Sequence, residues 1–235
     1  MATQSHGQYL AHVNPKFFAA VQLFAAVRDV RYYLQGVFID QHHEQGVVLV
    51  ATNGHHMAVM HDPEGWCERP VIVGGIPKSL IACCKKAGLE PPKHLWIGQD
   101  SAVVSSLEAS EPPDSPFCAD ALHACRISLI DAKYPDWRKV MPRQAKPVDV
   151  MPAMNAEYVA TVTAAAKLLH PSYPATRVFS TGTDCSLVFR ICGHEVADKF
   201  VAIIMPVRDF ETPEMLPKAF QLPAANLPGS EEARA

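Results

Sequence analysis

The chain has 235 residues, 49% of them hydrophobic, and its 21 Lys and Arg against 24 Asp and Glu give a formal charge of −3. This length can bury the core of one large domain or two small ones, and the mildly acidic total excludes a polycationic nucleic-acid binder. It does not exclude a protein that keeps its few cations on one DNA-facing surface.

No apolar run approaches the roughly 20 residues that a membrane helix needs, and residues 1–7 lack the basic start and apolar stretch of a signal peptide. We therefore expect a soluble, cytoplasmic protein. The odd number of cysteines and the lack of paired C-x-x-C motifs favour buried free thiols over a metal site or a disulfide framework. The cysteines are Cys67, Cys83, Cys84, Cys118, Cys125, Cys185 and Cys192.

The first stretch, residues 13–63, predicts a helix followed by three strands. Asn14 suits an N-cap and Pro15 the first helical position, and apolar residues then recur at helical spacing. Strands are expected at 31–40, 46–52 and 56–61; the second contains a β-branched, apolar run.

The second stretch begins with a strand at 70–74 and a helix from Pro77 that should end at Gly88, a C′ glycine. Further strands are expected at 95–97, 102–107 and 125–130. Residues 108–123 contain three prolines and indicate a long loop before the last of these strands.

The third stretch runs from residue 147, with Asn155 as the N-cap of a helix that continues to Leu169. Strands should follow at 176–180, 186–191 and 200–205. The proline-rich tail that begins at residue 209 is expected to be poorly ordered.

The same order, a helix and then about three antiparallel strands, occurs three times. This pattern predicts an α+β fold of three repeated units, because each apolar helix face has to cover a sheet. We expect an arm at 1–10, a domain of two units at 11–142, a single unit at 147–208 and a tail at 209–235.

Four segments occur in this order: RYYLQGVF at 31–38, VATNGHHMAV at 50–59, YPDWRKVMP at 134–142 and IIMPVR at 203–208. Together they resemble the bacterial β sliding clamp, the processivity subunit of the replicative DNA polymerase. The last three are similar to the family's A-T-D-G-H-R-L-A-V, F-P-D-Y-R-R-V-L-P and V-V-M-P-M-R.

The resemblance implies a DNA-clamp-like, non-enzymatic protein without a cofactor, whose helices line a hole for duplex DNA. A ring holds DNA by topology and needs no base readout. It also implies a pocket for short peptides of client proteins such as polymerases and repair factors. By position, the pocket residues are Leu34, Thr52, Gly54, His55, His56, Met57, Pro135, Lys139, Val140, Ile204, Met205, Pro206, Val207 and Arg208.

Their chemistry suits a peptide. Methionines can repack around different ligand side chains, and Gly54 permits a turn and close approach of a ligand backbone. Arg208, Lys139 and His56 are expected to meet acidic or polar positions of the peptide. Without the resemblance, apolar residues at strand ends would be assigned to the core.

The chain departs from the family pattern in several places. Three half-domains are predicted instead of six: the first two resemble the middle domain of a clamp, and the third resembles the last half of its final domain. Asn53 and His56 stand where the family has Asp and Arg. The surfaces that close a dimeric ring are therefore in question, although four chains with three units each would supply the usual twelve.

A DNA-facing helix layer would use the cations of the predicted helices, whereas the alternative is a set of lysines on solvated faces. The candidates are Lys16, Arg28, Lys78, Lys85, Lys86 and Lys167.

Two other classes of protein are alternatives to a clamp. A metalloenzyme is disfavoured, because adjacent histidines such as His42 and His43 point to opposite faces of a strand and no metalloprotease, hydrolase or nucleotide-binding motif is present. The segment 181–185 is expected to be a turn between strands. A peptide-binding module or decoy that never encircles DNA is the second rival; a homo-oligomeric ring would argue against it, and a monomer would support it.

Overall fold

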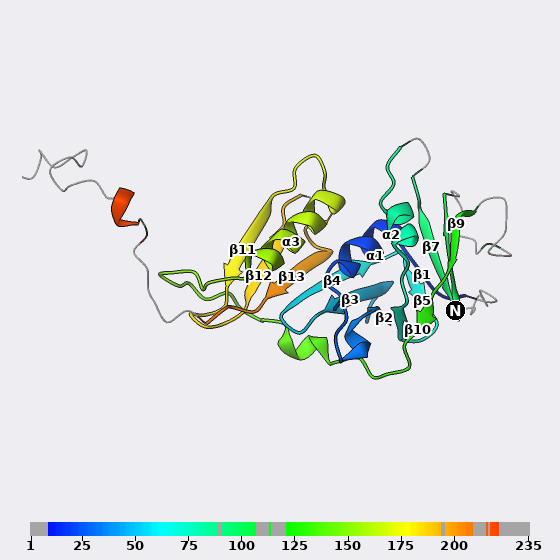
Figure 1. Cartoon of the computed structure of the whole chain (residues 1–235), viewed down its shortest axis with the longest axis horizontal. Coiled ribbons are helices and arrows are strands. Elements are labelled where there is room, and N and C mark those ends of the chain that lie inside the picture. Colours follow the sequence, from blue (N-terminus) through cyan, green and yellow to red (C-terminus); the bar gives the residue numbers. More distant parts are fainter. Residues whose placement is uncertain are drawn as a thin grey trace, which may run out of the picture.

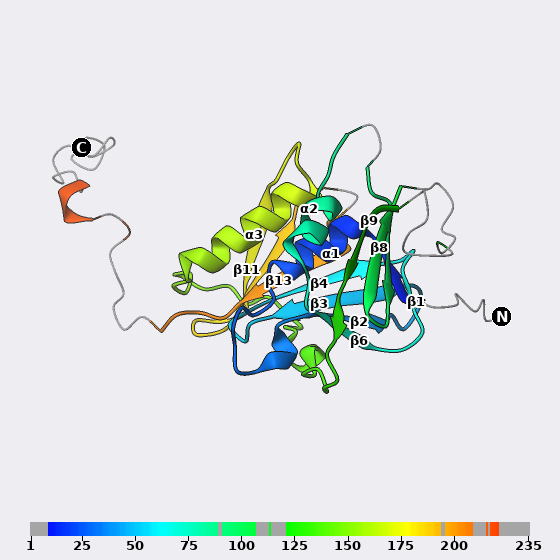
Figure 2. The same ribbon diagram turned by 45° about the vertical axis from the view of Figure 1, so that its right-hand side comes forward.

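The computed structural model describes residues 9–88, 91–106, 113, 121–193, 196–208, 215 and 217–220. Two antiparallel sheets and three helices make up the described part (Figure 1). The helices lie on one side of the larger sheet, and the single-turn 3₁₀ helices η1 and η2 lie on its other side (Figures 1 and 2).

The first repeat begins one strand earlier than the sequence suggested. β1 buries the alternate residues Tyr9, Ala11 and Val13. The limit expected at residue 10, between an N-terminal arm and the first domain, therefore falls inside this strand. The expected strand at 31–40 is shorter, because a 3₁₀ turn occupies its start. The elements are β1 Tyr9–Val13, α1 Pro15–Gln22, η1 Tyr32–Leu34, β2 Val37–Gln41, β3 Val47–Thr52, β4 His56–Asp62 and β5 Trp66–Cys67.

Helix α1 begins as predicted. The side chain of Asn14 accepts hydrogen bonds from the backbone N–H groups of Lys16 and Phe17, and Pro15 occupies the first turn. Phe18 and Val21 are fully buried, which directs the apolar face of the helix at the sheet.

In the second repeat, α2 ends at Cys84, earlier than predicted. The backbone N–H of Lys85 donates to the carbonyl of Ile81, so Gly88 lies beyond the helix. The last strand of the smaller sheet begins at Ala121, within the segment expected to be a loop. The elements are β6 Val71–Gly74, α2 Lys78–Cys84, β7 His94–Gly98, β8 Ser101–Ser105, β9 Ala121–Arg126, β10 Ser128–Leu129 and η2 Trp137–Val140.

The third repeat agrees with the sequence within one residue at each end. Asn155 accepts a hydrogen bond from the backbone N–H of Glu157 and caps α3. Residues 181–185 form the expected turn between two strands. The elements are α3 Ala156–Leu169, β11 Thr176–Ser180, β12 Leu187–Ile191 and β13 Phe200–Ile204, followed by a 3₁₀ turn η3 Lys218–Phe220.

The strand order of the larger sheet joins the first repeat to the third. Its order is β10-β6-β2-β3-β4-β13-β12-β11, and the smaller sheet has the order β5-β1-β7-β8-β9. β13 pairs antiparallel with β4, with Met57 opposite Ile203 and His56 opposite Ile204. Residues nearly 150 positions apart are therefore neighbours at the strand ends. The α+β fold of three repeats is confirmed.

The sheet has an apolar layer on each face. On the helix face, α1 packs against α2, α3, β3 and β4 around a large core that includes Phe18, Leu49 and Met60. On the other face, Leu34, Met57 and Ile203 belong to a second, smaller cluster together with Tyr134. This second cluster lies beneath η1 and η2 and positions the site described below.

Some expectations concern residues outside the described ranges. These are the loop at 108–120 apart from Pro113, most of the tail and Cys118. Six cysteines are described, all as free thiols, and Cys67, Cys83 and Cys84 among them are buried. In the described part of the chain no helix is both long and apolar enough to cross a membrane.

Candidate functional site

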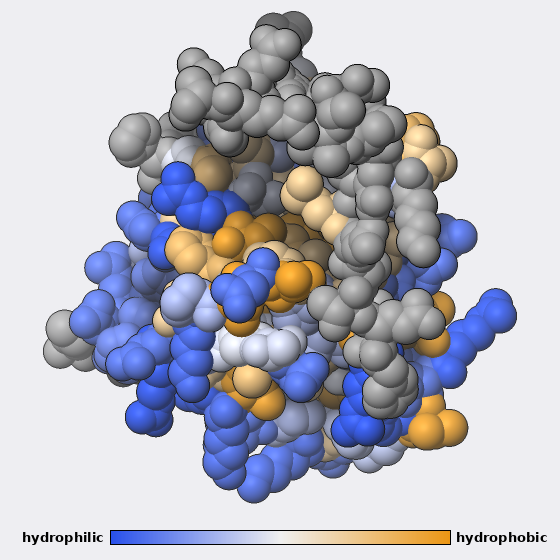
Figure 3. All heavy atoms as spheres, turned by 90° about the vertical axis from the view of Figure 1, so that its left-hand side faces the viewer, coloured by the Kyte–Doolittle hydropathy of each residue, from blue (hydrophilic) through white to orange (hydrophobic). Residues whose placement is uncertain are grey.

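A cavity of about 270 Å³ opens on the outer face of the larger sheet, where the ends of β3, β4 and β13 meet η1 and η2. Val140 and Met205 expose about half of their side chains there. Figure 3 views the end of the molecule that carries α3 and β11 and shows some apolar atoms exposed there among hydrophilic ones. The lining residues are Arg31, Tyr33, Leu34, Thr52, Gly54, His55, His56, Met57, Tyr134, Pro135, Asp136, Trp137, Val140, Ile203 and Met205; we call this cavity the groove.

Nine of the residues that the resemblance assigned to a pocket meet in the groove. They come from all three repeats, which the sheet brings together through the β4–β13 pairing. The nine are Leu34, Thr52, Gly54, His55, His56, Met57, Pro135, Val140 and Met205.

Five assigned residues do not line the groove. Ile204 is fully buried in the core on the helix side, because successive strand residues point to opposite faces, and Ile203 takes its place in the groove. The others lie at the surface around the groove. Lys139 is exposed and pairs with Asp136, and Pro206, Val207 and Arg208 follow the end of β13.

Six lining residues were not assigned from the sequence: Arg31, Tyr33, Tyr134, Asp136, Trp137 and Ile203. Five of them belong to the quoted segments 31–38 and 134–142, and the three aromatic residues among them, Tyr33, Tyr134 and Trp137, were a usable signal. The ring of Tyr134 stacks on Phe38 with centroids 4.6 Å apart, and burial raises the pKa of its hydroxyl. This stack holds the segment that carries Pro135 and Trp137 against the sheet.

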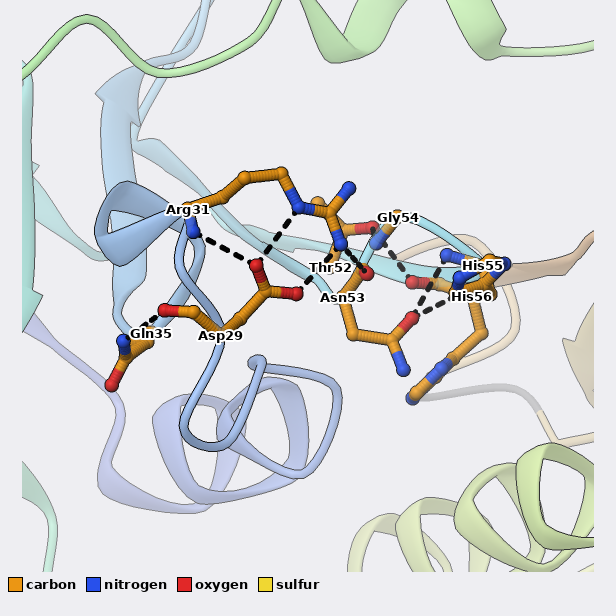
Figure 4. A network of polar contacts seen from close by, with 8 residues as sticks. All are labelled: Asp29, Arg31, Gln35, Thr52, Asn53, Gly54, His55 and His56. Atoms are coloured by element: carbon orange, nitrogen blue, oxygen red, sulfur yellow. Dashed lines mark hydrogen bonds and ion pairs between the residues drawn. The ribbon is translucent and has the colours of Figure 1, made fainter.

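Arg31 is the central polar residue of one rim (Figure 4). Its guanidinium makes two hydrogen bonds to the carboxylate of Asp29, with Nη2–Oδ2 at 2.7 Å, and the same Nη2 donates to the carbonyl of Asn53 at 2.9 Å. The side-chain hydrogen bond from Arg31, followed by the one from its backbone, lowers the pKa of Asp29 to about 2. The loop after α1 is thereby joined to the β3–β4 turn.

The β3–β4 turn is built by local hydrogen bonds. Asn53 Oδ1 accepts from the backbone N–H groups of His55 and His56 at 2.9 and 3.0 Å, and Thr52 Oγ1 donates to the carbonyl of His56 at 2.7 Å. Asn53 acts here through an oxygen acceptor, which an aspartate would also offer. Asn53, which stands where the family pattern has Asp, therefore makes the hydrogen bonds that the turn needs.

Gly54 lets Arg31 approach the turn. Its φ is +90°, in the region that favours glycine, and a Cβ at this position would lie 2.6 Å from Arg31 Nη1. Any larger side chain would have to displace the guanidinium.

The sequence placed His56 among the residues that meet acidic or polar positions of a peptide. Its side chain is buried, with its ring 4.4 Å from that of Tyr158 and 5.0 Å from that of Phe24. Neither ring nitrogen has a hydrogen-bond partner among the described residues. Burial, with a smaller contribution from His55, lowers the pKa of His56 to about 4, so the ring is neutral at pH 7. Arg31 is the cation that lines the groove instead.

The six cations proposed to face DNA lie on or beside the three helices. α1 packs against both α2 and α3, so the helices form one layer. Within the bounds of these helices Glu157 is the one acidic residue. Lys16 is in α1, Lys78 in α2, Lys85 and Lys86 directly after α2, Lys167 in the last turn of α3, and Arg28 in the loop after α1.

The histidine-rich segment gives no metal site. The ring of His42 lies 4.2 Å from that of His43 and 4.1 Å from that of His61. However, over the ranges that the structure describes, no group of three or more His, Cys, Asp or Glu side chains is arranged to hold a metal ion.

Comparison with known proteins points to one family. No protein-family model matches the chain. The β sliding clamp of Escherichia coli K12 is 25% identical over 140 residues, which cover 54% of this chain and 31% of the relative. That of Salmonella typhimurium is 25% identical over 128 residues with the same coverage. The chain thus matches about a third of the length of these curated relatives.

Solved structures extend the match to most of the chain. The β subunit of DNA polymerase III from Borrelia burgdorferi superposes with a TM-score of 0.57 at 14% identity, covering 88% of this chain and 67% of that one. The β subunit from Streptococcus pyogenes gives 0.58 at 12% identity, covering 89% and 68%. The chain therefore has the DNA-clamp fold, and over about half of its length its sequence is similar to part of the bacterial β sliding clamps.

Proposed function

We propose that the chain is a non-enzymatic accessory protein of DNA replication or repair that binds short, extended peptide segments of client proteins in the groove. The observation that supports this most directly is the meeting of four sequence segments, from three repeats, around one exposed apolar cavity. Clamp structures from Helicobacter pylori and B. burgdorferi were solved with small molecules bound, diflunisal and a natural product respectively.

The groove suits a peptide with two or three apolar anchors. Leu34, Met57 and Ile203 form a floor that is already buried, and Met205 and Val140 are exposed beside it. Each buried anchor contributes about 2 kcal/mol, from which the cost of ordering the peptide is subtracted. The balance corresponds to roughly micromolar affinity.

A random-peptide library displayed on phage provides the test. The library is selected on the full chain, and each selected peptide is then titrated against Met205→Asp and against Met151→Asp. Both methionines are about half exposed, at 49% and 44%, but Met151 does not line the groove. We expect Met205→Asp to abolish binding, because it places a charge in an apolar site, and Met151→Asp to retain it. Equal affinity for both variants would reject the groove.

Contact with duplex DNA is a second part of the proposal. The helix layer carries Lys16, Lys78 and Lys167 against the single acidic residue Glu157, which suits weak, sequence-independent phosphate contacts. Oligomeric rings of this chain would encircle DNA, whereas a monomer would act as a peptide-binding module or decoy. The mass of the protein in solution separates these two alternatives.

A further inference from the structure

The C-terminal tail carries two large apolar side chains that are mostly exposed in the described part of the molecule. The side chain of Met215 is 92% exposed and that of Phe220 is 71% exposed. Phe220 ends the 3₁₀ turn η3, in which its backbone N–H donates to the carbonyl of Pro217 at 2.8 Å. Both side chains are therefore available to bury apolar area in a contact.

The tail starts at the groove. Met205 lines the groove, and Arg208 ends the continuous described segment three residues later. Ten residues separate Met205 from Met215, and an extended chain of ten residues spans at most about 35 Å. A flexible linker of this length has a root-mean-square extension of about 17 Å. Both distances exceed the width of a cavity of about 270 Å³, so the tail is long enough to return to the groove.

The composition of the tail segment matches the groove. Residues 215–222 read Met-Leu-Pro-Lys-Ala-Phe-Gln-Leu, with four large apolar side chains and one charge. Pro213, Pro217 and Pro223 each restrict the backbone to φ near −65° and favour an extended conformation in the residue before them. A ligand restricted in this way loses less entropy on binding.

We propose that residues 215–222 are an intramolecular ligand of the groove, which a client peptide has to displace; the proposal rests on the groove being a peptide site. A short linker gives an effective concentration in the millimolar range. A tail with an intrinsic Kd of about 100 μM would then weaken the apparent affinity for a client roughly tenfold.

The test compares the full chain with the double variant Met215→Ser, Phe220→Ser, which removes both anchors without adding charge. The probe is a fluorescent peptide selected on the groove from a random library. We expect the double variant to bind the probe about tenfold more tightly than the unaltered chain. The matched control, Met215→Leu with Phe220→Leu, keeps the apolar anchors and should bind the probe as weakly as the unaltered chain does.

A second measurement asks where the tail binds. A synthetic peptide of residues 209–227 should bind the double serine variant and compete with the probe, and Met205→Asp should abolish both effects. Equal probe affinity for the unaltered chain and the serine variant would overturn the tail proposal and leave the groove intact. A library that yields no peptide whose binding is lost in Met205→Asp would overturn the proposed function, and the tail proposal with it.

The tail of a second copy is the competing occupant. In that case the difference between the unaltered chain and the serine variant would grow with protein concentration, and sedimentation would show a larger species. An intramolecular contact predicts a difference that is independent of concentration, so a concentration-dependent difference would also overturn the proposal.

Discussion

Arg31 Nη2 donates a hydrogen bond to the carbonyl of Asn53 at 2.9 Å and so connects two rims of the groove that lie 22 residues apart in the sequence. The same guanidinium pairs with the carboxylate of Asp29. The pKa of that carboxylate is about 2, so it is ionised at neutral pH. Arg31 therefore has a defined position before any ligand arrives, which lowers the entropy lost on binding.

Gly54→Ala should move Arg31 out of this position. The new Cβ would lie 2.6 Å from Arg31 Nη1 on a backbone with φ of +90°. We expect a loss of about 1–3 kcal/mol in the free energy of unfolding in urea, together with weaker binding of a groove-selected peptide. Gly88→Ala is the control, because Gly88 also has positive φ but no atom lies within 4 Å of the added Cβ. If both variants bind peptide equally well, Arg31 does not shape the groove.

The burial of His56 predicts a pH-dependent stability. Between pH 6.5 and about 4 the unfolded chain binds a proton on this residue that the folded chain does not. The contribution of neutral His56 to the free energy of unfolding is therefore complete above pH 6.5. It is lost as the pH falls towards 4, by up to about 1.4 kcal/mol per pH unit.

Chemical unfolding at several pH values measures this slope. His56→Phe keeps a ring next to Tyr158 and should flatten the slope over that window. If the slope is the same in His56→Phe, other titrating groups cause the pH dependence.

Substitutions at the adjacent residues Ile203 and Ile204 should affect different properties: one the affinity for peptide, the other the free energy of unfolding. Ile204→Ala opens a space in the core on the helix side and should cost about 2–4 kcal/mol of unfolding free energy without changing peptide affinity in the remaining folded protein. Ile203→Ala removes part of the groove floor and should weaken peptide binding. Titration and urea unfolding of both variants check the contrast, and the reverse pattern would contradict the assigned register.

Charge reversal on the helix layer tests the contact with DNA. Lys78→Glu combined with Lys167→Glu should reduce retention on circular duplex DNA, with the largest difference at low salt. Arg177→Glu combined with Lys139→Glu makes the same change in net charge at exposed positions outside α1, α2 and α3. Equal retention of the two double variants would favour a module that does not use its helices to hold DNA.

Local signals in the sequence predicted the helices and most strands. Asn14 and Asn155 each accept backbone hydrogen bonds at a helix start, which is a property of a few neighbouring residues. β1 escaped prediction because only three alternate residues mark it, and its partners β5 and β7 are more than 50 residues away.

The groove was predicted as a set of segments but not residue by residue. The resemblance assigned consecutive residues at the end of β13 to the pocket. Successive side chains of a strand point to opposite faces of the sheet, so Ile203 lines the groove and Ile204 lies in the core. The sequence predicted that His56 meets a polar position of a peptide, whereas the burial of its ring depends on contacts with Phe24 and Tyr158 from two different repeats. Such contacts are set by tertiary packing and are not visible in a local pattern.

The most direct test of the groove is the methyl spectrum of the protein with ¹³C-labelled methionine, recorded during titration with a groove-selected peptide. Met57 and Met205 line the groove, whereas Met60 is fully buried in the core on the helix side and Met151 lies outside the lining. We predict saturable shifts at Met57 and Met205, with Met60 and Met151 unchanged. Shifts confined to Met60 or Met151, with Met57 and Met205 unaffected by bound peptide, would contradict the account.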